Sequence, residues 1–205
     1  MRKNKKKFIY LISPNKITNN NFFNELENVF KSKKISFFQL RLKNTKIKRK
    51  FSIGKKIKKI CKKFKVKFLV NDDPFLAKKL NADGCHLGQK DMSINKARKI
   101  LKNKIIGITC HNSIKLAKIA IDNNADYIAF GAFNNSKTKK IRYKAKIRII
   151  HTIKKITKIP IVAIGGINSK NYKKLLLNKA NFLAISGYIW NNKNLKPLEA
   201  IKKLK

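Results

Sequence analysis

The sequence predicts a single-domain α/β protein of the (β/α)8 TIM-barrel class. Short runs of consecutive apolar residues, typical of strands buried on both faces, alternate with longer segments of helical apolar periodicity. The alternation repeats eight times along the chain, and eight such units favour a closed barrel over an open sheet. At 205 residues the chain is long enough for one such domain, and it contains no linker or low-complexity segment.

The predicted strands are short and largely apolar. The first follows a basic segment over residues 1–7, which we expect to be a flexible lead-in within a domain spanning 1–205. Each later strand follows a predicted helix, as the alternation requires. The strands are predicted at residues 8–13, 36–42, 66–70, 84–87, 105–109, 126–131, 160–164 and 181–186.

The predicted helices carry apolar residues three and four positions apart. In the third helix we expect Phe75, Leu76 and Leu80 to share the buried face. Side-chain oxygens are expected to cap three helix starts, from Ser93, Ser113 and either Asn168 or Ser169. The helices are predicted at residues 21–31, 51–64, 74–80, 93–101, 113–121, 145–156, 168–177 and 197–204.

The net charge of +43 raises the question of a nucleic-acid partner. However, the abundant residues are Lys, Asn, Ile and Phe, which A- and T-rich codons encode, and the lysines are spread over all predicted helices. No RNP aromatic motif, helix-turn-helix or zinc finger is visible. We therefore attribute the charge to base composition and expect no specific nucleic-acid partner, although salt-sensitive binding to polyanions follows from charge alone.

Other features of the composition indicate a cytoplasmic protein. No apolar run approaches 18 residues, so no membrane span is predicted. The three cysteines are far apart and show no metal-binding spacing, so we expect reduced structural thiols. The oligomeric state is not set by the sequence, and a homo-oligomer is compatible with it.

Acidic residues are scarce, with nine Asp and Glu against 52 Lys and Arg. Asp72 follows the third predicted strand, and Asp91 comes shortly after the fourth. Because these strands are expected to be parallel neighbours, both carboxylates should reach the same face of the sheet. Carboxylate oxygens suit hard cations, so the pair predicts a Mg²⁺ site.

Polar residues alternate at the end of the second predicted strand. Gln39, Arg41 and Lys43 share one face, and burying them in a barrel would be costly without a ligand. Arg41 can bind phosphate oxygens in a fork, and Lys43 adds a positive charge. The alternative is a strand that reaches the surface early.

Loops after the last three strands contain residues suited to phosphate. Gly165 and Gly166 separate the seventh strand from a helix, so backbone N–H groups can approach an anion closely. Ser186 and Gly187 follow the eighth strand, and loops seven and eight form the usual phosphate site of this fold. The loop after the sixth strand adds a weaker signal from Ser136, Thr138 and Lys139.

In this order, several motifs together resemble the thiamine-phosphate synthase family. They are Gln-x-Arg-x-Lys, Asn-Asp-Asp, Ala-Asp-Gly-x-His-Leu-Gly-Gln-x-Asp, Gly-x-Thr-x-His, Ser-x-Thr-Lys and Ile-Gly-Gly-Ile. The resemblance runs over residues 37–190, and the stretch at 82–91 is its most specific part. Thr109 replaces the usual serine, Ser136 the usual threonine, and Ala132 and Asn135 the usual prolines.

The resemblance implies a reaction between 4-amino-2-methyl-5-(diphosphooxymethyl)pyrimidine and a thiazole phosphate, which gives thiamine phosphate and diphosphate by a dissociative, Mg²⁺-assisted path. It implies that Asp72 and Asp91 hold Mg²⁺ and that Thr109 contacts the pyrimidine. The pyrimidine diphosphate would be held by Gln39, Arg41, Lys43, Asn71 and Lys139. Of these, Arg41, Lys43 and Lys139 would stabilise the departing diphosphate. The thiazole phosphate would be held by Ser136, Thr138, Gly166, Ser186 and Gly187.

Two alternatives stay open at the level of the sequence. One is a thiazole tautomerase of the same fold, which would use His111, although such a protein has little use for both Asp72 and Asp91. The other is a non-catalytic barrel that binds thiazole phosphate and releases no diphosphate. We expect His86 to be a packed strand residue rather than a ligand.

Overall fold

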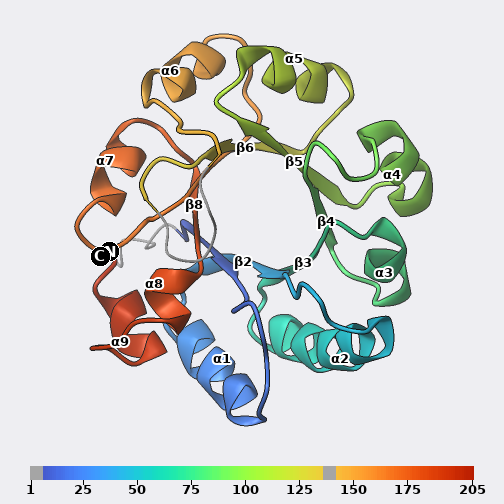
Figure 1. The fold of residues 1–205 in the computed structure, drawn as a ribbon, viewed down its shortest axis with the longest axis vertical. Helices are drawn as coiled ribbons and strands as arrows, with labels where there is room; N and C mark the ends of the chain where they lie inside the picture. The colour runs from blue at the N-terminus through green and yellow to red at the C-terminus, as the bar shows by residue number, and fades with distance from the viewer. Residues whose placement is uncertain (1–6, 136–141) are drawn as a thin grey trace, which may run out of the picture.

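The computed structural model describes residues 7–135 and 142–205. Its eight strands form a closed barrel in chain order, and β1 pairs with β8 to complete the ring (Figure 1). All neighbouring strands are parallel. The strands are Ile9–Ile12 (β1), Ile35–Leu40 (β2), Lys67–Asn71 (β3), Gly84–Leu87 (β4), Ile105–His111 (β5), Tyr127–Gly131 (β6), Ile161–Ile164 (β7) and Phe182–Ile185 (β8). The predicted fold class is confirmed.

The helices surround the barrel in one outer layer (Figure 1). They are Asn21–Lys31 (α1), Ile47–Lys63 (α2), Pro74–Lys79 (α3), Ile94–Leu101 (α4), Ile114–Asp122 (α5), Arg148–Lys154 (α6), Tyr172–Leu177 (α7), Gly187–Trp190 (α8) and Pro197–Lys202 (α9). The short α8 was not predicted. No helix among residues 7–135 and 142–205 is long and apolar enough to cross a membrane.

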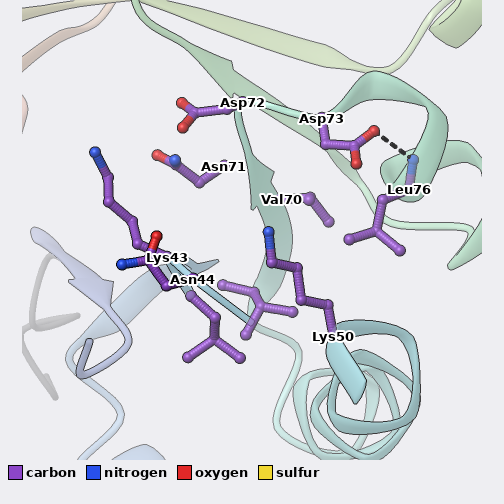
Figure 2. A pocket seen from close by; sticks show the side chains of 10 residues that line it. Lys43, Asn44, Lys50, Val70, Asn71, Asp72, Asp73 and Leu76 are labelled. Atoms are coloured by element: carbon purple, nitrogen blue, oxygen red, sulfur yellow. Dashed lines mark hydrogen bonds between the residues drawn. The ribbon is translucent and has the colours of Figure 1, made fainter. Parts of the chain in front are cut away.

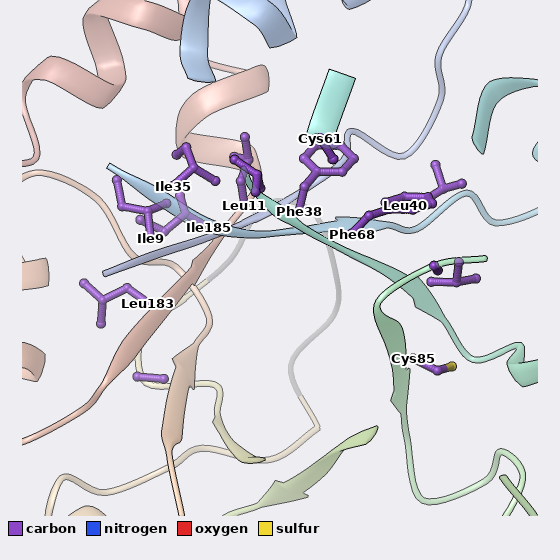
Figure 3. Close-up of a cluster of buried hydrophobic side chains, with 14 of the residues drawn as sticks. Ile9, Leu11, Ile35, Phe38, Leu40, Cys61, Phe68, Cys85, Leu183 and Ile185 are labelled. Carbon is purple, nitrogen blue, oxygen red and sulfur yellow. The ribbon is translucent and has the colours of Figure 1, made fainter. Parts of the chain in front are cut away.

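Alternation along each strand divides the apolar side chains between two cores. On β1, Ile9 and Leu11 join the large core between the strands and the helices, part of which is drawn in Figure 3. Tyr10 and Ile12 instead belong to a smaller cluster inside the barrel. Side chains therefore fill the barrel interior, which leaves its rim for ligands.

Some local predictions were right and others wrong. Ser93 and Ser113 cap α4 and α5, as their side chains accept bonds from Lys96 and Leu116 backbone nitrogens. Phe75 is 63% exposed rather than buried, and Ala77 takes its place on the inner face of α3.

The predicted cap of α7 was also wrong. The helix begins at Tyr172, after Asn171, because the Asn168 carboxamide forms a local turn by accepting from the Lys170 nitrogen. Cys61, Cys85 and Cys110 are buried free thiols, as predicted.

Candidate active site

The two scarce carboxylates meet at the carboxyl ends of β3 and β4. Asp72 has a left-handed backbone (φ 65°), and its nitrogen donates to the His86 carbonyl over 2.8 Å. Asp91 closes a turn by accepting from the Gly88 nitrogen over 2.7 Å. These contacts place the two carboxylates beside each other, as the sequence predicted from strand order.

The electrostatics of this pair favour a cation. Although Asp72 reaches solvent, the surrounding atoms remove part of its hydration, and this is the largest cause that raises its pKa. The adjacent Asp91 raises the pKa as well, Arg41 and Lys43 lower it, and the resulting pKa is about 6.

No cluster of three or more His, Cys, Asp or Glu suited to a metal exists in the described parts of the chain. A two-carboxylate set fits Mg²⁺, which usually takes one or two carboxylates and fills its remaining positions with water and substrate phosphate.

A solvent-open pocket lies next to this pair, between the ends of β2 and β3. Asn71 lines it from the end of β3 and Asp72 from the residue that follows, and Lys43 reaches towards them from the segment after β2 (Figure 2). Lys50 from α2 also lines the pocket, and it was missed because α2 begins at Ile47, four residues before the predicted start. The pocket thus joins acidic and basic groups at one rim of the barrel.

Arg41 is held at the same rim through Ser13, which sequence reasoning missed. The Ser13 hydroxyl accepts from the Arg41 nitrogen over 2.9 Å, and the guanidinium donates to Asn15. Ser186 in turn donates to the Ser13 carbonyl over 3.0 Å. Ser13 is 2% exposed and connects the ends of β1, β2 and β8. An isolated serine after a strand gives no sequence signal for such a role.

Gln39 and Thr109 face the barrel interior. Gln39 is 2% exposed and donates its side-chain nitrogen to the Tyr10 hydroxyl, so it lies deeper than Arg41. Thr109 is half-buried, and its hydroxyl lies 2.8 Å from Nε2 of His86. His86 is a packed strand residue, as predicted, and burial lowers its pKa to about 4, so it is neutral at pH 7.

The glycines after β7 approach the loop after β6. Gly165 and Gly166 have backbone φ values of 105° and 58°, which residues other than glycine rarely adopt. A Cβ at Gly166 would collide with the Asn135 carbonyl oxygen. Gly187 begins α8 directly after Ser186. Ser136, Thr138 and Lys139, predicted to belong to this region, lie outside the described residues.

His111, the residue expected of a tautomerase, ends β5 with φ 53°. Its ring stacks on Tyr143, with the ring centroids 4.1 Å apart and the planes 26° from parallel.

The family model described as thiamine monophosphate synthase matches residues 9–189. The chain belongs to this family. It is 72% identical to the thiamine-phosphate synthase of Pelagibacter ubique, over all of both chains. It is 37% identical to that of Nitrosomonas eutropha, over 79% of this chain and 77% of the relative.

Among solved structures, the thiamine phosphate pyrophosphorylase of Pyrococcus furiosus has the same fold. It aligns with a TM-score of 0.84 at 26% identity, and the match covers 97% of this chain and 94% of that one. The family, the fold and the motifs in the sequence therefore agree.

Proposed function

We propose that this chain condenses 4-amino-2-methyl-5-(diphosphooxymethyl)pyrimidine with a thiazole phosphate and releases thiamine phosphate and diphosphate. The observation that carries the proposal is the rim where the Asp72–Asp91 pair faces Arg41 and Lys43. A site with both signs of charge suits a cation and a diphosphate bound together. Family membership supports the same reaction.

In the proposed reaction, the bond between the pyrimidinylmethyl carbon and the diphosphate oxygen breaks, and its electron pair leaves with diphosphate. The thiazole nitrogen then gives its lone pair to that carbon. The protein supplies no nucleophile. It lowers the barrier by placing positive charge on the departing diphosphate and by holding the two rings in line.

Arg41 and Lys43 are proposed to bind the diphosphate oxygens, with Asn71 beside them. Asp72 and Asp91 would hold Mg²⁺, which when bound neutralises charge on the leaving group. Arg41 suits this role because Ser13 holds its backbone at the rim and its guanidinium, which donates to Asn15, can bind phosphate oxygens in a fork. Gln39, which lies deeper, would act from below the rim, and Lys139 is assigned by family resemblance alone.

The second substrate is proposed to bind between the loops after β7 and β8. Gly166, Ser186 and Gly187 would offer backbone and hydroxyl groups to the thiazole phosphate, and Thr109 would contact the pyrimidine ring. Ser136 and Thr138 complete the proposed set by family resemblance. The partners are therefore small phosphorylated molecules, and we propose no specific nucleic-acid partner.

The test is to incubate the purified protein with both substrates and Mg²⁺ and to separate the products by chromatography. Thiamine phosphate should form, and Lys43→Ala should slow it more than Lys118→Ala, which removes an exposed lysine of the outer helix α5. Thiazole isomerisation without thiamine phosphate would favour the tautomerase. Tight thiazole phosphate binding without any turnover would favour the non-catalytic barrel.

A further inference from the structure

Five polar side chains form a hydrogen-bonded chain inside the otherwise apolar barrel. Gln39 Nε2 donates to the Tyr10 hydroxyl over 3.0 Å, and that hydroxyl lies 2.8 Å from the Tyr127 hydroxyl. The Tyr127 hydroxyl lies 2.8 Å from Nδ1 of His86, and Nε2 of His86 lies 2.8 Å from Oγ1 of Thr109. The chain therefore starts below the rim and ends at Thr109, which is half-buried at the mouth.

The barrel interior is shaped around this arrangement. Gly107 lies in register between His86 and Tyr127 on three neighbouring strands. A Cβ at Gly107 would collide with the Tyr127 ring, so the glycine makes the space through which the tyrosine reaches the histidine. The two rings stack with centroids 5.6 Å apart and an angle of 16°.

The direction of each hydrogen bond in this chain follows from the number of protons that each group can donate. The Gln39 nitrogen only donates, so the Tyr10 oxygen accepts from it; among the described residues Tyr127 is the remaining partner of the Tyr10 hydroxyl, so the Tyr10 proton is directed to Tyr127. Burial raises the pKa of both phenols, so each keeps its proton at neutral pH.

Tyr127 then donates to Nδ1 of His86, which places the imidazole proton on Nε2. His86 in turn donates to Oγ1 of Thr109, and the hydroxyl proton of Thr109 is left for a different acceptor.

We propose that this hydrogen-bonded chain fixes the Thr109 hydroxyl as a donor to the pyrimidine substrate, with His86 as the positioning residue. The hydroxyl would then select an acceptor on the ring, namely an unprotonated ring nitrogen, and not the amino group, whose hydrogens are donors. This orients the pyrimidine at the mouth. Only the identity of the substrate rests on the proposed function.

The first test uses the substrate-free wild-type protein and ¹⁵N NMR at pH 7. The chain has three histidines, so spectra of His111→Ala and His151→Ala assign the signals of His86. We expect His86 in the Nε2–H tautomer. The Nδ1–H tautomer, or an equal mixture of the two, would overturn the proposal whether or not the protein is a synthase.

The second test separates positioning from general damage. Thr109→Val and His86→Leu should each raise the KM for the pyrimidine diphosphate about fivefold, the effect of one lost hydrogen bond. His86→Gln keeps an N–H donor near the Nε2 position and should restore most of the affinity. The KM for the thiazole phosphate should stay unchanged in all three variants.

The double variant decides whether His86 acts through Thr109. If it does, His86→Leu adds nothing further once Thr109 is valine. If the two fold-changes multiply instead, His86 has only a separate structural effect and the proposal fails.

Discussion

The Asp72–Asp91 pair leads to a prediction that can be tested without any substrate. The pKa of Asp72 is about 6 instead of 3.8, because burial and Asp91 disfavour its charged form. Between these two pH values the folded chain binds more protons at Asp72 than the unfolded chain does. This group therefore stabilises the metal-free fold below about pH 4, and that contribution is lost as the pH rises through about 6.

Binding of Mg²⁺ requires the ionised form and should show the opposite dependence on pH. With a pKa of about 6, roughly nine-tenths of Asp72 is ionised at pH 7 and one-tenth at pH 5, so the apparent Kd should rise about tenfold. With Mg²⁺ at ten times its Kd at pH 7, binding stabilises the fold by about 1.4 kcal/mol there and about 0.4 kcal/mol at pH 5. The corresponding increases in Tm are about 3–6 °C and about 1 °C for a domain of this size.

Thermal unfolding followed by circular dichroism, with and without MgCl₂ at constant ionic strength, measures these shifts. Asp72→Asn and Asp91→Asn should abolish the shift at pH 7. An asparagine at 91 retains an oxygen that can accept from the Gly88 nitrogen, so the turn is preserved. Asp122→Asn, which changes an exposed carboxylate at the end of α5, is the control. Equal shifts at pH 5 and pH 7, or a full shift in both site variants, would refute the metal site.

Three further substitutions test other parts of the site. Arg41→Lys should lower kcat/KM for the pyrimidine diphosphate by about 10²-fold, because lysine cannot form the paired hydrogen bonds, and near-normal steady-state kinetics would argue against its role. Gly166→Ala should reduce the free energy of unfolding by about 1–3 kcal/mol, since φ is 58° there and the new methyl group meets Asn135; an unchanged urea midpoint would contradict this. His111→Ala should lower synthase turnover by less than about tenfold, below the usual contribution of a general acid or base, whereas a loss of about 10³-fold would support direct catalysis by His111.

The fold could be predicted from the sequence because strands buried on both faces require uninterrupted apolar runs. The exposure of Phe75 could not be predicted, because α3 has only six residues and too few turns to define an apolar face. The start of α7 was missed for a related reason. The carboxamide of Asn168 can cap a helix or close a local turn, and only the structure shows that it closes the turn.

The site was predictable where charge is unusual and unpredictable where contacts are long-range. Asp72 and Asp91 were predicted to lie together because acids are rare in the chain and both follow neighbouring strands, and the structure brings the two carboxylates together. Ser13 acts through the ends of three strands that are distant in sequence. In the sequence, Tyr10 and Tyr127 look like any aromatic residue of a strand, and they are 117 positions apart. Only closure of the barrel brings their two hydroxyl oxygens to a distance of 2.8 Å.

The most direct test of the proposed synthase activity is a ³¹P NMR time course with both substrates and Mg²⁺. The signals of the pyrimidine diphosphate and the thiazole phosphate should decline together. Free diphosphate and thiamine phosphate should rise in a one-to-one ratio, and omission of the thiazole phosphate should prevent thiamine phosphate from forming. If diphosphate is released without thiamine phosphate, or if neither product appears with a correctly folded protein, the proposed function is wrong.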